Sequence, residues 1–438
     1  MGQSLDRSWV GVGGSFPKGM HKVDMKPIQV NAELLGECGF FAHGKHSGEL
    51  ADLFKFDRRR VLLGEGAAYH LGDECARLKA RKVFLVRDPA VAEFERTIRW
   101  TLEREGIELV GVYDEVVPNP TVASVDAFAA TMAEADCDAV VALGGGSTMD
   151  TVKVGLAVAT SGGSSADYFG FDQFAEPAKW PLIAMPTTAG TGAEASRVAV
   201  VVAEEGKQAV YSDHIQPAVA IVDPLLTRDL PPVLTAITGL DALGHALECT
   251  ASKKSGAVGD AVARESLRAG LPHIAAAVKE GMENPEARYE MSRCSLLAGL
   301  LLSPINTGAA HALGYGIEKV SHAMGKPVPH GTAVALVLPG VIRHNAPVAG
   351  DKYYYAGGVA GLELGGGSRE AGVELVADWI DTFRRRYTPF GSLTSAGLGE
   401  EEIPRMVEIG MGVRRLLDPN PVEVTPEDAA AIYRQVLQ

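Results

Sequence analysis

The sequence predicts an α/β domain followed by an all-helical domain, and three observations support this fold class. Short apolar runs, each typical of a buried strand, recur between residues 60 and 224. Helical stretches of ten or more residues, such as 122–136, separate them, which indicates a parallel sheet covered by helices on both faces. After Asp223 and Pro224 the strand pattern stops, and only helical patterns follow.

The individual elements can be placed along the chain from these patterns. The predicted strands are 81–88, 107–116, 138–147, 181–188 and 217–224. The predicted helices of the second half are 234–252, 259–282, 287–303, 330–345, 372–387 and a last helix after Val424. That helix opens with Thr425 as N-cap, Pro426 and two acids in its first turn.

The first 56 residues differ from the rest of the chain. They are rich in glycine, lysine and histidine and show no sustained helical or strand period. We expect an appended arm, which packs on the body, serves a subunit contact or forms a partly ordered surface segment. The predicted domains are therefore the arm at 1–56, an α/β domain at 57–226 and a helical domain at 227–438.

Composition excludes several classes of partner. The 438 residues carry a formal net charge of −14, so the chain is expected to repel phosphate backbones and anionic membranes, and neither nucleic acid nor membrane is a predicted partner. The five cysteines include no CxxC pair, which favours reduced thiols in a cytosol. The sequence shows no secretory signal and no apolar run of about 18 residues. We expect a soluble, cytoplasmic protein that forms a closed homo-oligomer, the commonest form of soluble assembly.

A glycine-rich turn follows the third predicted strand. Gly144, Gly145, Gly146 and Ser147 end the strand, and a helix is expected to start near Thr148. Glycines allow a ligand to approach the backbone, and a helix N-terminus offers free N–H groups to a pyrophosphate. The turn is not the usual GxGxxG fingerprint, so a tight turn without a ligand is the alternative.

A second polar turn favours a ligand. Residues 186–192 end another strand and offer the hydroxyls of Thr187, Thr188 and Thr191. Open α/β sheets bind ligands at the carboxyl ends of their strands. Asp88 ends the first predicted strand, where its carboxylate can bind a ribose hydroxyl and would repel a 2′-phosphate. NAD is therefore favoured over NADP, although Asp88 before Pro89 is also a common turn residue.

The helical half contains a candidate metal site. Asp241 and His245 lie four residues apart on an apolar helix and share one face, although a buried Asp and His can also simply hydrogen-bond. His311 and His330 follow, each beside a small residue. Three imidazoles and a carboxylate suit Fe(II), Zn(II) or a similar divalent ion. His322 competes with His330, which is preferred because Pro329 and Gly331 let a helix begin there.

With these turns and this candidate metal site, the chain resembles the iron-containing, or group III, alcohol dehydrogenase family. The family's motifs occur in order from about residue 57 to the end: GGGSTMDTVK (144–153), PTTAGTGAEAS (186–196), GLDALGHALE (239–248), AAHALGYG (309–316) and VPHGTAVALVLP (328–339).

The resemblance implies a Rossmann-like nucleotide-binding domain and a helical metal-binding domain, an architecture shared with 3-dehydroquinate synthase. It implies an oxidoreductase that interconverts a small alcohol and its aldehyde or ketone. The implied metal ligands are Asp241, His245, His311 and His330. These four residues and Tyr315 are also the implied catalytic residues. The implied residues around the dinucleotide are Asp88, Gly145, Gly146, Ser147, Asp150, Thr187, Thr188, Thr191, Lys207 and Leu226.

The chain departs from the family pattern in three places. The arm at 1–56 is unusual, and Tyr315 stands where many members have a second histidine four residues after the third ligand. The proton relay therefore stays open between Tyr315, His322 and the ribose hydroxyls. The segment between His311 and His330 is also long, and a different alignment would put Thr307 in the third ligand position.

Two other enzyme classes remain as alternatives. A dehydroquinate-synthase-like cyclase or lyase usually has Glu in place of Asp241, and a maleylacetate-type reductase works without a metal. A non-catalytic binding protein would have no use for both sites. Arg197 and Lys253 raise the question of an acidic aldehyde as substrate, but solvated surface charge is the preferred interpretation of both.

Overall fold

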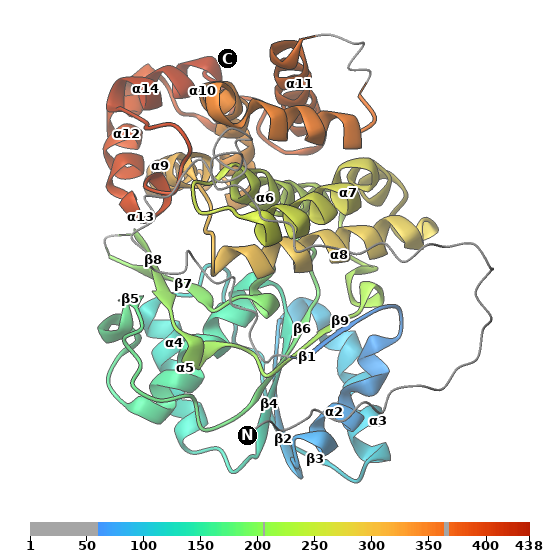
Figure 1. Cartoon of the computed structure of the whole chain (residues 1–438). Coiled ribbons are helices and arrows are strands. Elements are labelled where there is room, and N and C mark those ends of the chain that lie inside the picture. The colour runs from blue at the N-terminus through green and yellow to red at the C-terminus, as the bar shows by residue number, and fades with distance from the viewer. Residues whose placement is uncertain (1–59, 205, 363–367) are drawn as a thin grey trace, which may run out of the picture. The chain divides into compact units, whose positions relative to one another are not determined.

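The computed structural model describes residues 60–204, 206–362 and 368–438, so the predicted arm at 1–56 lies outside the described residues. Six parallel strands form the main sheet (Figure 1). In spatial order they are β1 (Arg60–Leu63), β9 (Val219–Val222), β6 (Leu182–Pro186), β4 (Ala139–Gly144), β2 (Lys82–Arg87) and β3 (Glu108–Tyr113). The five predicted strands are all present, and all belong to this sheet.

Helices cover both faces of the sheet because its strands are apolar on both sides. Val83 and Leu85 of β2 face one core, with α2 (Leu71–Arg77) and α3 (Glu95–Arg104). Phe84 and Val86 face the opposite core, with α4 (Val122–Ala133) and α5 (Gly146–Ser161). Figure 1 shows these two helix pairs on opposite sides of the strands. Continuous apolar strands of this kind are typical of parallel sheets.

One prediction about the strand order was wrong. Asp88 follows β2, which is the second strand of the chain, because β1 precedes it. β1 has only four residues, lies at the edge of the sheet and pairs with β9 alone. Two of its residues are exposed, so its sequence lacks the apolar run that marks the interior strands.

A second, smaller sheet was not predicted. β7 (Val198–Ala203) and β8 (Gly206–Tyr211) form an antiparallel pair, and β5 (Gly170–Phe171) adds to β8 in parallel. Val201 and Val210 of this sheet share a core with residues of α5. The small sheet therefore packs against α5, the helix that follows the first glycine-rich turn.

Helices form the rest of the described chain, with no strand after β9 in residues 223–362 and 368–438. They are α6 (Pro232–Ala251), α7 (Ala257–Glu280), α8 (Pro285–Leu302), α9 (Ala309–Ala323), α10 (His330–Val359), α11 (Arg369–Tyr387), α12 (Ile403–Gly412), α13 (Arg414–Leu417) and α14 (Pro426–Gln435). Thr425 caps α14 in a capping box with Asp428. A parallel-sheet region followed by a helical region confirms the predicted fold class.

The central helix of this region is α6. Almost every residue from Thr235 to Ala251 is buried, because α7, α8 and α10 pack around it. Polar side chains on α6 are therefore held inside protein rather than in water. None of the helices in the described residues has the length and apolar character needed to cross a membrane.

The loop after β6 packs directly on the helical region. A Cβ atom at Gly192 would lie 2.5 Å from the Cα atom of Gly299 on α8, so only glycine permits this approach. Gly192 also has a φ of 60°, which favours glycine. The second predicted ligand loop is thus fixed between the sheet and the helices.

Candidate active site

The first half of the site is the carboxyl edge of three neighbouring strands. β2 pairs with β4, and β4 pairs with β6, so the turns that follow these strands lie side by side. The backbone N–H of Asp88 donates to Leu143 O at 3.0 Å, and the N–H of Thr187 donates to Gly144 O at 3.0 Å. Because β3 lies on one side of β2 and β4 on the other, this edge is a switch point of the sheet, where open α/β sheets bind ligands.

The two glycine- and threonine-containing turns form one continuous surface at this edge. A Cβ atom at Gly146 would lie 2.6 Å from Thr191 Cγ2, and one at Gly145 would lie 3.3 Å from Thr188 Cγ2. Gly145 is the N-cap of α5 and has no side chain with which to satisfy the first N–H groups of the helix. This arrangement can accept a phosphate group, because the helix N-terminus provides N–H donors and a positive dipole.

Several of the predicted cofactor residues also have partners within the protein. The Asp88 carboxylate accepts from the N–H of Ala90 at 2.9 Å. Asp88 therefore stabilises the turn at Pro89, which was the alternative to binding a ribose. Ser147 Oγ accepts from the N–H of Asn119 at 3.1 Å. Asp150 Oδ2 accepts from the N–H of Val200 at 3.0 Å and thereby joins α5 to β7.

The remaining predicted cofactor residues do not all lie at this edge. Thr187 is buried, whereas Thr188 and Thr191 are half-buried. Leu226 packs in the core beneath the sheet, with the residues of α2 and α3. Lys207 forms an ion pair with Glu318 of α9 and so points into the helical region.

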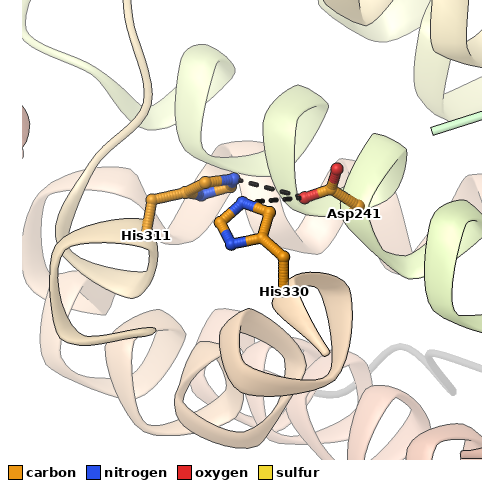
Figure 2. Close-up of side chains that lie close together, drawn as sticks. All are labelled: Asp241, His311 and His330. Atoms are coloured by element: carbon orange, nitrogen blue, oxygen red, sulfur yellow. Dashed lines mark ion pairs between the residues drawn. The ribbon is translucent and has the colours of Figure 1, made fainter. Parts of the chain in front are cut away.

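The second half of the site is a cluster of four side chains from three helices. Asp241 and His245 come from α6, His311 from α9 and His330 from the first position of α10. The Nε2 atoms of the three histidines lie 3.7, 3.5 and 3.6 Å from Asp241 Oδ1, in that order. Figure 2 shows His311 and His330 pointing toward Asp241. The structure therefore brings together all four residues predicted as metal ligands.

The spacing of this cluster fits a divalent ion. Candidate ligand atoms of Asp241, His311 and His330 all lie within 4.8 Å of one another. Bonds of about 2.1 Å in a tetrahedron place neighbouring ligands about 3.3 Å apart, close to the separations observed. Asp241 Oδ1 and His311 Nε2 are buried, and neither has a hydrogen-bond partner. A buried pair of this kind is costly unless something else occupies the space between them.

Two carboxylates that the sequence did not predict, the buried Glu248 and the partly buried Glu318, orient the histidines. The Nδ1 atom of His311 contacts Glu248, and that of His330 lies 2.5 Å from Glu318. These contacts turn both Nε2 atoms toward Asp241, as partners of metal-binding histidines commonly do. Glu248 lies seven residues after Asp241, and Glu318 lies seven after His311, so helical spacing was the available signal.

Electrostatics keep the cluster suited to binding a cation. Burial raises the pKa of Asp241, but the three neighbouring histidines outweigh it and hold that pKa well below the usual range. Burial lowers the pKa of His245 to about 4. Burial also lowers the pKa of His311, but Glu248 and Asp241 outweigh it and raise it to about 10. The carboxylate is therefore ionised, and a cation that entered would displace the proton from His311.

The two halves of the site are adjacent. A Cβ atom at Gly190, in the loop after β6, would lie 2.7 Å from Thr238 Cβ on α6. Thr238 is three residues before Asp241 and so lies about one turn away along the helix. On β8, Lys207 contacts Glu318, which in turn contacts His330.

The structure also separates the competing residues. His322 is exposed on the last turn of α9, whereas the ring centre of Tyr315 lies 5.7 Å from that of His330. Thr307 precedes α9, and His311 is the α9 residue that faces Asp241.

Neither of the two cations considered for an acidic substrate is available near the cluster. Arg197 pairs with Asp172 and with Asp213, the latter at 3.1 Å. Lys253 is exposed. The interpretation as solvated surface charge agrees with the position of Lys253, whereas the side chain of Arg197 is only 20% exposed.

Comparison with known proteins supports the same relationship throughout the described fold. The family described as "Iron-containing alcohol dehydrogenase" matches residues 58–224, and "Fe-containing alcohol dehydrogenase family, C-terminal" matches residues 235–437. Alcohol dehydrogenase 4 of Saccharomyces cerevisiae (strain YJM789) is 32% identical over 379 residues, which cover 86% of this chain and 96% of that protein.

Two solved structures are similar along nearly their whole length. The crystal structure of 1,3-propanediol oxidoreductase has a TM-score of 0.80 and 31% sequence identity, covering 87% of this chain and 100% of that one. Sulfoacetaldehyde reductase from Bifidobacterium kashiwanohense, solved in complex with NAD+, has a TM-score of 0.75 and 30% identity, covering 88% and 98%. The chain therefore belongs to the iron-containing alcohol dehydrogenase family, a family of oxidoreductases.

Proposed function

We propose that this chain is a metal-dependent, NAD-linked dehydrogenase that interconverts a small alcohol and its aldehyde or ketone. The observation that carries the proposal is the convergence of Asp241 and three imidazoles beside the carboxyl edge of a parallel sheet. Family membership supports an oxidoreductase with a nicotinamide cofactor and a divalent metal.

Asp241, His245, His311 and His330 would hold the metal, which in our proposal is Fe(II) or Zn(II). A divalent ion bound there supplies a Lewis acid for the substrate oxygen. Glu248 and Glu318 fix the rings of His311 and His330, so these ligands need little reorganisation when the ion binds.

The turns after β2, β4 and β6 would hold the dinucleotide. Gly145, Gly146 and the N-terminus of α5 provide backbone donors for a pyrophosphate, and Thr188 and Thr191 add hydroxyls. Asp88 lies beside them and favours NAD over NADP, because its charge repels a 2′-phosphate. The nicotinamide supplies or accepts the hydride. We propose that five further residues support the dinucleotide site: Asp150, Ser147, Thr187, Lys207 and Leu226.

Tyr315 is the residue we propose for the proton. Its ring lies beside His330, and its hydroxyl belongs to a side chain that is partly exposed. A phenol in this position can relay a proton: its oxygen accepts the hydroxyl proton of an alcohol while its own proton passes to solvent, and the two transfers reverse for an aldehyde. His322 is too exposed on the far turn of α9 to be the first acceptor.

The proposal extends to the organisation of the chain. We propose a dinucleotide-binding domain at 57–226 and a catalytic domain at 227–438, supported by the end of the strands at Val222 and the start of α6 at Pro232. We also propose a cytoplasmic homo-oligomer. The four cysteines in the described residues are buried free thiols, which supports a reducing compartment. Light scattering after size-exclusion chromatography measures the oligomeric state.

Metal analysis combined with a spectrophotometric assay tests the function. We expect about one divalent ion per chain, and formation or loss of NADH with a panel of small alcohols and aldehydes. The same panel with NADP(H) measures the cofactor preference. Activity that persists after metal removal and in His245→Ala would indicate a metal-independent maleylacetate-type reductase instead. A product formed without net change in NADH would indicate a cyclase or lyase.

A further inference from the structure

A positively charged side chain, that of Arg415, lies beside Tyr315. Arg415, on α13, is half-buried, and its guanidinium carbon lies 5.6 Å from the ring centre of Tyr315 and 5.9 Å from that of Tyr211. Arg415 Nη1 donates to the Tyr211 hydroxyl at 3.2 Å. Stacking on two aromatic rings holds a guanidinium in place and leaves part of its donor fork for another acceptor.

Arg415 differs from the other cations near the site in having no acidic partner among the described residues. Lys207 is neutralised by Glu318, and Arg197 is neutralised by two aspartates. Among residues 60–204, 206–362 and 368–438, no carboxylate lies within 4.0 Å of the Arg415 guanidinium. A half-buried charge is commonly paired with an opposite charge, so an arginine whose described contacts are two tyrosines can bind an external anion.

The arginine lies within reach of the histidine cluster. The ring centres of His330 and Tyr315 are 5.7 Å apart, and Tyr315 is 5.6 Å from the Arg415 guanidinium carbon. Added end to end, these two distances place the guanidinium within about 11 Å of the His330 ring. The His330 side chain is 26% exposed, so it is accessible from solvent, in contrast to the buried side chain of His311.

We propose that Arg415 binds a carboxylate of the substrate, so that the enzyme acts on short acidic aldehydes or the matching hydroxy acids. This inference rests on the proposed function and specifies its substrate class. The reacting carbon lies at the cluster, and the carboxylate at the other end of the substrate receives hydrogen bonds from the guanidinium. Arginine suits this task because its planar fork matches the two oxygens of a carboxylate.

The distance between the guanidinium and the His330 ring sets an upper limit on the length of the substrate. An extended four-carbon acidic aldehyde measures about 6 Å from its carbonyl oxygen to its carboxylate, at about 1.2 Å per bond along the chain. Contacts of about 3 Å at both ends extend its reach to about 12 Å. Chains of up to about four carbons can therefore span a separation of at most about 11 Å, and longer chains would have to fold.

The experiment compares an acidic aldehyde with its neutral counterpart. Initial rates of NADH oxidation are measured with 4-oxobutanoate and with butanal for the metal-loaded wild type and Arg415→Met. We expect the substitution to lower kcat/KM for 4-oxobutanoate ten- to hundredfold, the usual value of hydrogen bonds to a charged group, and to change it less than threefold for butanal. Arg415→Lys keeps the charge and is expected to fall between the two.

Arg414→Met is the matched control, because Arg414 is the exposed neighbour and pairs with Asp418 at 2.6 Å. It should leave the ratio of the two kcat/KM values unchanged. An equal loss with both aldehydes in Arg415→Met overturns the inference and assigns Arg415 a structural role. Wild type that reduces butanal but not 4-oxobutanoate also overturns it and leaves the proposed function intact.

A binding measurement keeps the inference testable if no aldehyde is turned over. Calorimetry compares butanoate with butanamide, its neutral analogue, on the wild type and Arg415→Met. Binding of butanoate that exceeds that of butanamide and is lost in Arg415→Met supports the anion site. Equal binding of the two compounds by the wild type, or no change in the variant, counts against it. Absence of NADH turnover with every substrate would reject the proposed function separately.

Discussion

The two halves of the site are built from different chemical groups. Apart from Asp88, the carboxyl edge of the sheet presents neutral groups: backbone N–H groups, glycines and threonine hydroxyls. The helical cluster presents an ionised carboxylate and imidazoles, which the carboxylates of Glu248 and Glu318 hold in place. A surface made of backbone depends on shape, whereas a cluster of charged side chains depends on the identity of every member. A substitution in one half should therefore change the binding of that half's ligand and leave the binding of the other ligand nearly unchanged.

The largest expected effect follows loss of the shared carboxylate. In Asp241→Asn, the three imidazoles lose the anion that all of them face, so the metal content should fall below about a tenth of an ion per chain. We expect kcat/KM to fall at least about 10³-fold, since Lewis-acid catalysis supplies several kcal/mol. Binding of NADH, followed by fluorescence, should change little. A variant that keeps its metal, or loses NADH binding equally, would contradict the separation.

The carboxylates behind the histidines should have the next largest effect. Glu318→Gln removes the charge that orients His330 and pairs with Lys207, so metal affinity should fall about ten- to a hundredfold. Competition with a chelator measures that affinity. Glu400→Gln is the control, because Glu400 forms an exposed ion pair with Arg434. Similar metal affinities in both variants would remove Glu318 from the supporting set.

How far the sequence predicted this site depends on the distance over which each signal acts. Asp241 and His245 share one helical face, and Pro329 marks the start of the helix at His330, so local patterns located these candidate ligands. The histidines that Glu248 and Glu318 contact lie more than ten residues away in the sequence. An acid on a helix is usually solvated, so the seven-residue spacing from a candidate ligand was too weak a signal to identify these two.

The fold shows the same limit. The interior strands were predicted because burial on both faces gives a continuous apolar run, as in β4 and β6. β1 is short and partly exposed, and β7 and β8 form a small sheet with half-buried residues, so each depends on pairing with distant segments. Arg415 was missed for the same reason, since its two tyrosine neighbours lie far away in the sequence.

The neutral half of the site should respond to shape. Gly146→Ala places a Cβ atom 2.6 Å from Thr191 Cγ2 and should separate the two turns slightly. We expect NADH binding to weaken about tenfold, or about 1.4 kcal/mol, with an unchanged metal content. Thr191→Ser removes the methyl group that is contacted, so adding it to Gly146→Ala should restore part of the binding. Loss of metal in Gly146→Ala would show that the two halves are coupled.

The smallest effect concerns stability at the boundary of the neutral half. Burial raises the pKa of Asp150 from 3.8 to about 6, although Lys153 and the N–H of Val200 oppose it. Since the folded pKa lies above the unfolded one, this group favours folding fully below pH 3.8, and that contribution is lost as the pH rises through 6. Asp150→Asn keeps an acceptor for Val200 and removes the charge.

The variant should therefore be more stable than the wild type at pH 8, by about 1–2 kcal/mol, and the difference should vanish near pH 4. This value is below the roughly 3 kcal/mol that two pKa units represent, because the side chain of Asp150 is only half-buried. Thermal unfolding followed by circular dichroism at both pH values measures the difference. A variant less stable at pH 8 would mean that the carboxylate stabilises the junction of α5 and β7, and that this neutral edge also depends on a charge.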